Sequence, residues 1–272
     1  MFGNWKYIFK NIWFVLPFAI LPGAFLALSL DYTAIRETVK AFFTGDPSIG
    51  FIQLFRAWSL IRVDSWVGAL IGAGAYLSVS VCTALMLSLV EKHMRIGKRT
   101  LSGAFSQLGN NLFTALGVTL LYLFLYEAWA VVTAAIQYAV GGIVDNATGV
   151  YLISVAAYLV LGGVLFYCST IFYLWLPCLQ HTGFHGYEAL RYSYQLMINV
   201  RGRLFFSLAG GFIGACALFG VFAVYLPRPL FYAAAFLVCV WLYLSFCIRM
   251  ETFYFATDKL DREDLIRSYR EL

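Results

Sequence analysis

Six long apolar stretches dominate the sequence, and each is long enough to cross a bilayer as an α-helix. Five contain no Asp, Glu, Lys or Arg, and the third contains a single acid, Glu127. A hydrocarbon core about 30 Å thick takes roughly 20 helical residues to cross, and in lipid only a helix or a closed barrel satisfies every backbone hydrogen-bonding group. Because the stretches are continuous and do not alternate in polarity as barrel strands do, they predict helices. The expected spans are residues 12–30, 66–90, 112–140, 150–179, 204–226 and 229–248.

The composition leads to the same class of protein. Of the 272 residues, 62% are hydrophobic and only 12% are charged, which leaves too little polar surface for a soluble globular protein. We therefore expect an all-α integral membrane protein, with a bundle of six transmembrane helices as one domain over residues 1–257. Residues 258–272 follow as a tail, in which Asp261 and the apolar residues from Leu265 onward predict a short amphipathic helix.

Lys and Arg residues are distributed unevenly between the connections, and this distribution predicts the orientation. Fourteen of the 19 fall on one side, and four of the other five share the first connection with four acids. Both termini and the connections 91–110 and 181–203 are therefore expected in the cytoplasm. The net charge of +5 suits the anionic inner leaflet of a cytoplasmic membrane and does not indicate nucleic-acid binding.

The first apolar stretch also has features of a cleavable signal, because Lys6 and Lys10 precede it and Ala27-Leu28-Ser29 ends it. It is longer than the apolar core of a usual signal peptide. We therefore expect an uncleaved first span.

Two of the cytoplasmic connections each carry a segment with the pattern of an amphipathic helix. In residues 97–110 and 186–199, apolar side chains recur at i, i+4 and i+7, which is one face of a helix. We expect both helices at the inner interface, with their basic residues toward lipid headgroups. The two segments match at a constant offset, so spans two and three either duplicate spans four and five or resemble them by chance. The basic residues predicted to contact lipid or a protein partner are Lys98, Arg99, Arg191, Arg201 and Arg203.

The second of these segments resembles a known family. Its residues Gly186, Ala189-Leu190, Ser193 and Leu196 follow Pro177 and precede Arg201-Gly202-Arg203. This order is similar to the cytoplasmic G-x-x-A-L-x-x-S-x-x-L segment of a loose superfamily, which includes the membrane domain of some glycerophosphodiester phosphodiesterases and related bacterial polytopic proteins of unknown function. The resemblance covers about a quarter of the chain. It implies a bacterial cytoplasmic-membrane protein associated with lipid, and it carries over no catalytic residue, because chemistry in those phosphodiesterases belongs to a separate soluble barrel.

The first outer connection, residues 31–65, is longer than a simple turn. Asp46-Pro47-Ser48 favours the start of a helix, and Phe51, Phe55, Trp58 and Ile61 then follow at helical spacing. The pattern predicts a helix at the outer interface. The alternative is a lid over an outward-facing cavity.

Glu127 is the only acid well inside an apolar stretch. A carboxylate in hydrocarbon is unfavourable by a few kcal/mol or more, so it must be neutral, paired, or exposed to water in a cavity. One hypothesis is a proton or cation site in a transport path. The other is that the third helix is shifted, so that Glu127 lies near the outer interface and is hydrogen-bonded to a Tyr or Ser.

His181 and His185 stand four residues apart, with His93, Cys178 and Glu188 as further candidate ligands. On a helix this spacing could hold one metal ion, but Gly183 weakens a helix there and the H-E-x-x-H pattern is missing. We expect histidines at the interface, no metal and no cofactor. The six cysteines show no C-x-x-C spacing and are expected to be buried free thiols.

Small residues mark places where helices can approach closely. Gly68 and Gly72 lie in the second span, and Gly210 and Gly214 lie in the fifth. Both pairs have the GxxxG spacing that favours close helix packing. We expect them to pack within the bundle.

Catalytic motifs give no support for an enzyme, since the sequence contains no G-x-S-x-G elbow and no Walker A loop. The expected function is a non-enzymatic role in binding lipid or a partner at the cytoplasmic membrane. The alternative is a transporter for a small molecule or lipid that uses Glu127. Transport predicts a cavity that reaches Glu127, whereas a scaffold predicts a closed bundle.

Overall fold

The computed structural model describes residues 2–44, 49–62, 65–99, 104–144 and 146–265. Throughout these ranges the regular secondary structure is α-helical, as the apolar stretches predicted. The helices are α1 (Phe2–Lys10), α2 (Ile12–Val15), α3 (Pro17–Ser29), α4 (Tyr32–Thr44), α5 (Phe51–Trp58), α6 (Trp66–Ile96), α7 (Ala104–Ile143), α8 (Ala147–Phe172), α9 (Trp175–Thr182), α10 (Gly186–Met197), α11 (Arg201–Tyr225) and α12 (Arg228–Thr257).

Five segments of this helical fold are long and apolar enough to cross a membrane. They are Trp66–Ile96, Leu112–Ile143, Thr148–Thr182, Arg201–Tyr225 and Arg228–Thr257. The pair α3 and α4 passes the same test together but is bent by 58°, so that up to six crossings fit the described part of the chain. The class predicted from the sequence, an all-helical protein with the helices of a multi-pass membrane protein, is confirmed.

Two long helices, α6 and α12, form the centre of the bundle together with α3. Met86, Leu87 and Val90 of α6 and Leu244 and Ile248 of α12 are all buried. The helices α7, α8 and α11 bury much less of their surface and expose large apolar side chains outward, among them Phe206 and Ile213. Apolar side chains all round a helix suit lipid on the outer face and protein on the inner face.

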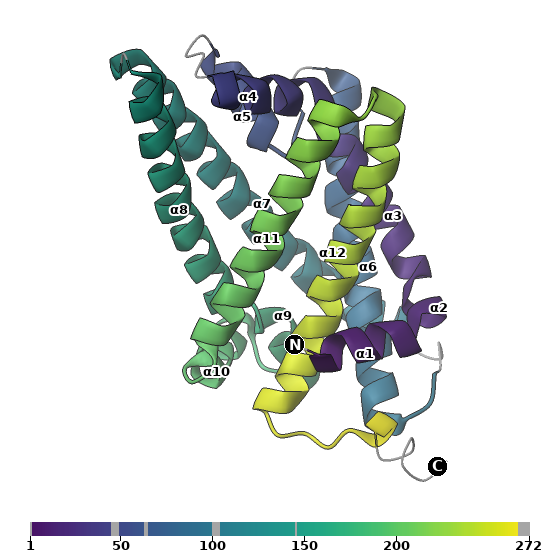
Figure 1. Cartoon of the computed structure of the whole chain (residues 1–272). Helices are drawn as coiled ribbons and strands as arrows, with labels where there is room; N and C mark the ends of the chain where they lie inside the picture. The colour runs from purple at the N-terminus through teal and green to yellow at the C-terminus, as the bar shows by residue number, and fades with distance from the viewer. Residues whose placement is uncertain (1, 45–48, 63–64, 100–103, 145, 266–272) are drawn as a thin grey trace.

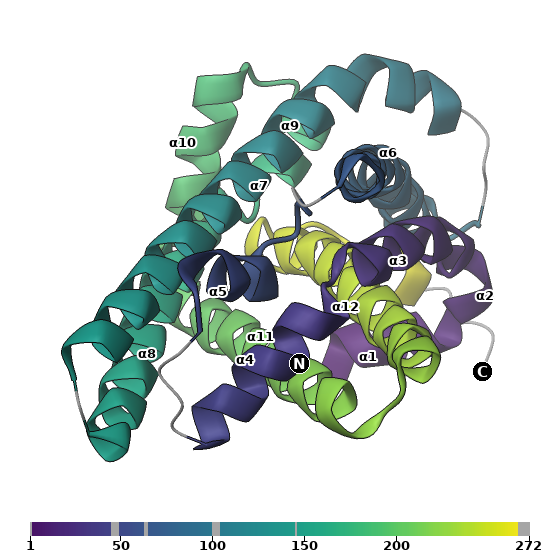
Figure 2. The same ribbon diagram turned by 90° about the horizontal axis from the view of Figure 1, so that it is seen from above.

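Short helices cover the two ends of the bundle. At one end α4 and α5 lie across the long helices, and at the other end lie α1, α9, α10 and the last turns of α12 (Figures 1 and 2). Asp31 begins α4 by accepting hydrogen bonds from the backbone N–H groups of Thr33 and Ala34, both at 3.1 Å, as an N-terminal cap does. Gly50 is the residue before α5, and the predicted start at Asp46-Pro47-Ser48 lies outside the described residues.

Several predicted helix boundaries need correction. The first expected span is divided into α2 and α3, with Pro17 at the start of α3 and Pro22 inside it. The fourth is divided into α8 and α9 at Tyr173 and Leu174. The sixth continues past residue 248 to Thr257, because this end of the helix packs against other helices, with Met250, Tyr254 and Phe255 buried.

The amphipathic helix predicted over residues 97–110 agrees with the structure only in part, since residues 104–110 are helical but belong to the long helix α7. The helix α6 ends at Gly97, whose φ of 72° is left-handed and favours glycine, and the described chain resumes at Ala104 already within α7. The counterpart at 186–199 is confirmed as α10, with Ala189, Ser193 and Met197 buried and basic Arg191 exposed. The two supposed repeat units therefore differ in their helices, and chance resemblance is the better interpretation of their offset.

The two GxxxG pairs behave differently. Gly68 and Gly72 are buried, and a Cβ at Gly72 would lie 3.6 Å from Ile61. Gly210 and Gly214 are exposed, and a Cβ at either position would meet nothing within 4 Å. The prediction of packing within the bundle is therefore wrong for Gly210 and Gly214, because this face of α11 points away from the other helices.

Candidate functional site

A cavity of about 540 Å³ lies between α6, α7, α8, α11 and α12 and is partly open to the outside of the bundle. Its size is within the range of about 300–1,000 Å³ that is usual for small-molecule sites. The wall is almost entirely apolar and aromatic, and it includes Ile35, Trp58, Tyr126, Gly211, Phe212 and Cys239. Such a wall suits an apolar molecule or the alkyl chain of a lipid.

The end of the cavity near α4 and α5 is closed by these two helices and by residues 59–61, together called the roof. Ile35, Thr38 and Val39 of α4 and Ala57 and Trp58 of α5 face the cavity. Figure 2 shows both helices lying over this end of the bundle. The lid that the sequence left as an alternative for this connection thus agrees better with the structure than a helix that only rests on the membrane.

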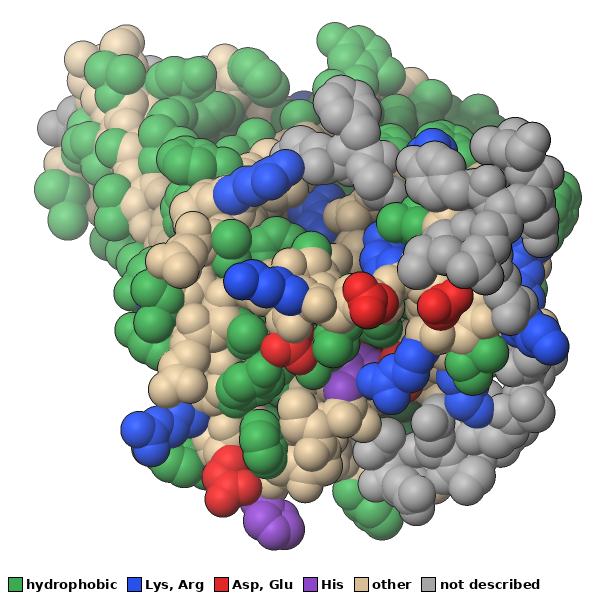
Figure 3. Space-filling model, turned by 90° about the horizontal axis from the view of Figure 1, so that it is seen from below, with side chains coloured by type: hydrophobic (Ala, Val, Ile, Leu, Met, Phe, Trp, Pro, Cys, Tyr) green, Lys and Arg blue, Asp and Glu red, His purple; other side chains and the backbone are tan. Residues whose placement is uncertain are grey.

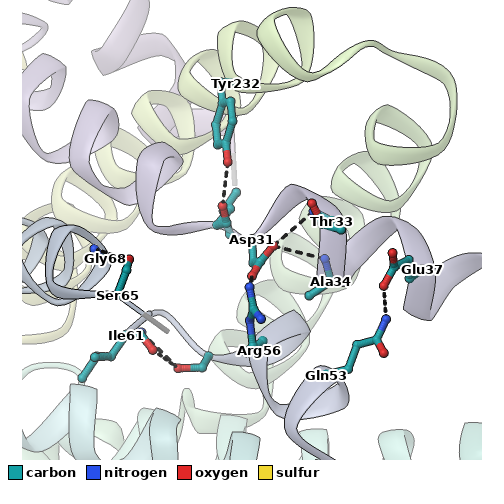
Figure 4. Close-up of polar contacts among 12 residues, drawn as sticks. Asp31, Thr33, Ala34, Glu37, Gln53, Arg56, Ile61, Ser65, Gly68 and Tyr232 are labelled. Atoms are coloured by element: carbon teal, nitrogen blue, oxygen red, sulfur yellow. Dashed lines mark hydrogen bonds and ion pairs between the residues drawn. The ribbon is translucent and has the colours of Figure 1, made fainter. Parts of the chain in front are cut away.

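An ion pair joins the two helices of the roof (Figure 4). Arg56 donates from Nε and Nη2 to Asp31 Oδ2, at 2.9 and 2.6 Å. The Asp31 side chain is almost fully buried, and its other oxygen caps α4. Gln53 of α5 also donates to Glu37 of α4. Because Asp31 serves both the cap and the ion pair, the start of α4 and the position of α5 depend on one carboxylate.

Glu127 of α7 ties the roof to the long helices. Its Oε2 accepts a hydrogen bond from Ser59 Oγ at 2.8 Å, and its Oε1 accepts from the backbone N–H groups of Leu60 at 2.9 Å and Ile61 at 3.2 Å. The neighbouring Tyr126 donates to the Trp58 carbonyl at 2.8 Å. Glu127 does not line the cavity, although Tyr126, Leu60 and Ile61 do. The serine is a partner that the second sequence hypothesis expected, but the shift of the helix that this hypothesis also expected is not seen, since Glu127 lies midway along the apolar segment Leu112–Ile143.

The opposite end of the cavity is bounded by Arg249 of α12. It lies on the same face of α12 as Cys239, Leu242, Ser245 and Phe246, which also line the cavity. Among the described residues no hydrogen-bond acceptor or carboxylate pairs with its guanidinium. An arginine stays charged in a protein, so the cavity combines an apolar wall with one positive end.

A buried cluster of charges lies at the end of the bundle opposite the roof. His181 of α9 is placed between two carboxylates, with Nε2 at 3.0 Å from Glu251 Oε2 of α12 and Nδ1 at 3.2 Å from Glu91 Oε1 of α6. Arg95 lies 3.1 Å from the same Glu91 oxygen, and the Tyr254 ring stacks on the imidazole with centroids 4.8 Å apart. The cluster joins α6, α9 and α12. Its two carboxylates are paired with His181 and Arg95 of the same cluster.

The other candidate metal ligands are not gathered around His181. His185 caps α10 together with Glu188 and is exposed, while His93 accepts or donates a hydrogen bond at 2.8 Å with the Tyr7 hydroxyl of α1. Within the described ranges no group of three or more His, Cys, Asp or Glu side chains is arranged to hold a metal ion. The six cysteines are free thiols.

Lys and Arg side chains lie among acidic side chains on the end of the bundle seen in Figure 3. The five basic residues predicted to contact lipid or a partner differ in their surroundings. Lys98, Arg191 and Arg203 are exposed. Arg99 is also exposed, but its Nε donates to Asn11 at 3.0 Å. Arg201 differs from the others, because its guanidinium lies 4.4 Å from the Tyr194 ring and 5.7 Å from the Tyr167 ring, in the geometry of cation–π contacts.

No protein-family model matches the chain, and no curated protein or solved structure matches it. The class that the fold defines is therefore an all-helical protein whose helices are compatible with several membrane crossings.

Proposed function

We propose that this chain is a non-enzymatic protein of a bacterial cytoplasmic membrane that binds a lipid or another apolar molecule in its internal cavity. In this proposal α2 with α3, α6, α7, α8 with α9, α11 and α12 are the six crossings, and both termini lie in the cytoplasm. The excess of Lys and Arg at the end that carries α1 and α10 supports this orientation.

The observation that carries the proposal is the cavity itself. Closely packed helices leave few voids larger than a water molecule between them, so a partly open apolar space of about 540 Å³ is large enough to receive a small molecule or an alkyl chain. The roof closes the outer end with named contacts from Asp31, Arg56 and Glu127. A single molecule bound between the helices fits this arrangement.

The same contacts argue against transport through Glu127. A carrier acid must exchange between two exposures, but this carboxylate takes hydrogen bonds from three donors of the roof. It is outside the cavity wall. We therefore assign Glu127 to holding the roof and not to carrying a proton or cation.

Filling the cavity tests the proposal. Gly211 faces the cavity, and neighbouring Gly210 does not; a Cβ at either position meets nothing within 4 Å. The full chain in neutral detergent is titrated with hexadecanol, and bound molecules are counted by native mass spectrometry. We expect one bound molecule in the wild type and in Gly210→Phe, and binding weaker by at least about tenfold in Gly211→Phe. Equal binding by both variants, or no binding by the wild type, would overturn the proposal.

A further inference from the structure

The polar groups of the cavity are concentrated at one end of it. Arg249 lies one helical turn beyond Ser245 on the cavity face of α12. Ser207 of α11 lines the cavity as well. Ser245 is 17 residues from the start of α12 at Arg228, and Ser207 is 18 residues from the end of α11 at Tyr225. Because the two helices meet at their short connection, both serines lie at a similar depth, about 25–27 Å from it at 1.5 Å per residue.

These groups lack partners within the protein. The hydroxyl oxygens of Ser207 and Ser245 are buried without a hydrogen bond. Two other arginines are paired with carboxylates, since Arg56 binds Asp31 and Arg95 binds Glu91. The carboxylate nearest to Arg249 in sequence, Glu251, is taken by His181. A buried donor without an acceptor is unfavourable by about 1–3 kcal/mol, and both serine hydroxyls are such donors. Arg249 beside them is partly buried, so this end of the cavity has polar and cationic groups that no acceptor of the described residues pairs with.

The rest of the cavity has the dimensions of an alkyl chain in one leaflet. Ten residues of α12 separate Arg249 from Cys239, which packs with Ile35 of α4 in one apolar cluster. At 1.5 Å per residue this distance is about 15 Å, half of a hydrocarbon core of about 30 Å. The space between Arg249 and the roof is therefore as long as the chains of one leaflet, and its wall is apolar.

We propose that the cavity binds an anionic amphiphile, with a carboxylate or phosphate headgroup at Arg249 and the alkyl chain extending to the roof. This inference rests on the proposed function and specifies its ligand. Arginine binds carboxylate and phosphate through two parallel N–H donors. The two serine hydroxyls provide further donors at the same end of the cavity. A neutral lipid would leave the guanidinium without a counter-charge, and a cationic one would be repelled.

Four ligands with the same hexadecyl or palmitoyl chain length test the headgroup alone. The full chain in neutral detergent is titrated with palmitate, hexadecyl phosphate, hexadecanol and hexadecyltrimethylammonium, and native mass spectrometry measures each dissociation constant. A charge-assisted hydrogen bond is worth about 1.5–3 kcal/mol, so we expect palmitate or hexadecyl phosphate to bind about ten- to a hundredfold more tightly than hexadecanol. Whichever anion binds more tightly identifies the headgroup as carboxylate or phosphate.

Variants of Arg249 separate this inference from the proposed function. In Arg249→Gln we expect the anions to bind no better than hexadecanol, whose own affinity is retained and shows that the cavity is folded. Arg249→Lys is expected to keep part of the preference, and Arg203→Gln, an exposed residue of α11, to keep all of it. If hexadecanol binds the wild type as tightly as palmitate and hexadecyl phosphate do, or if Arg249→Gln keeps the preference, the anionic ligand is refuted while the apolar site stands. If none of the four ligands binds, both are refuted.

Discussion

Replacing Glu127 with Ala would remove an acceptor that takes three hydrogen bonds from the roof. The Ser59 hydroxyl would keep a partner, because it also lies 2.9 Å from the Ile61 carbonyl. The Ile61 N–H would keep Ser59 Oγ at 3.0 Å. The Leu60 N–H has no such second acceptor among the hydrogen bonds of the described residues. The variant should therefore loosen the roof where α5 meets α6 and leave the α4 end of the roof in place.

The magnitude follows from the nature of these bonds. Hydrogen bonds to a charged group contribute about 1.5–3 kcal/mol each, and a buried donor left without an acceptor costs about 1–3 kcal/mol. The Leu60 N–H would lose its acceptor, while the Ser59 hydroxyl and the Ile61 N–H would keep other partners. We therefore expect Glu127→Ala to lower the free energy of opening the roof by about 2–4 kcal/mol. Glu127→Gln keeps one carbonyl oxygen near the two backbone donors and should lower the free energy by about 1 kcal/mol.

Hydrogen exchange measured by mass spectrometry on residues 49–62 is the direct assay, because exchange of these amides reports local opening. We expect exchange in Glu127→Ala to accelerate by roughly thirtyfold or more, and exchange in Glu127→Gln to accelerate several-fold. Asp261→Ala, which removes an exposed acid outside the roof, is the control and should behave nearly as the wild type. Unchanged exchange in Glu127→Ala would refute the role in holding the roof. Loss of ligand binding in Glu127→Gln without faster exchange would instead favour the proton or cation site.

Three further substitutions test other contacts of the fold. His181→Ala would leave Glu91 and Glu251 buried without their shared partner, and we expect a loss of about 3–5 kcal/mol in the free energy of unfolding, measured by denaturant titration in detergent; a loss no larger than that of the exposed control His185→Ala would contradict this. Asp31→Ala removes the cap of α4 and the partner of Arg56, and should cost about 2 kcal/mol, whereas Asp31→Asn retains the cap oxygen and should cost less; equal losses would show that the cap contributes nothing. The hydrogen bond from Tyr192 of α10 to Asp258, at 2.5 Å, raises the pKa of Tyr192 from 10.0 to about 12, so the neutral phenol is favoured in the folded chain. Its contribution is complete below pH 10.0 and is lost as the pH rises toward about 12. Tyr192→Phe should therefore be less stable than the wild type at neutral pH, and the difference should shrink above pH 10.0; a difference that stays constant over this range would refute the assignment.

The long apolar helices could be predicted from sequence because lipid leaves the backbone few alternatives. Their ends could not. Positions 90 and 248 end the charge-free stretches, but α6 and α12 continue past Glu91 and Glu251, whose carboxylates are satisfied by His181 inside the protein. Placing the end of a span at the first charged residue gives the wrong boundary when that residue has a buried partner. A signal was nevertheless present, since an acid or a histidine follows each of three apolar stretches that end on the same side.

The sequence predicted the helix in the connection 31–65 but not what that helix packs against. The helical spacing of Phe51, Phe55 and Trp58 predicted α5 correctly, but one face of a short apolar helix looks the same whether it rests on lipid or on a cavity. The distinction depends on Arg56 and Glu127, whose partners are 25 and about 67 residues away in the chain. Single-sequence periodicity carries no information on such pairs. The same limit explains why Gly210 and Gly214 were predicted to pack inside, since GxxxG spacing does not say which way a helix face points.

The structure gives Arg249 a different environment from the one that the sequence predicts. In sequence it is one of 14 basic residues that predict orientation, and its place just after the sixth apolar stretch suggests a headgroup contact at the membrane surface. In the structure the same side chain bounds an internal cavity, with Ser245 one turn away and its hydroxyl unpaired. A residue selected only for orientation could be exposed to the lipid surface as Arg203 is. Its position against an apolar cavity, without a carboxylate of its own, is explained by a ligand that brings the missing negative charge.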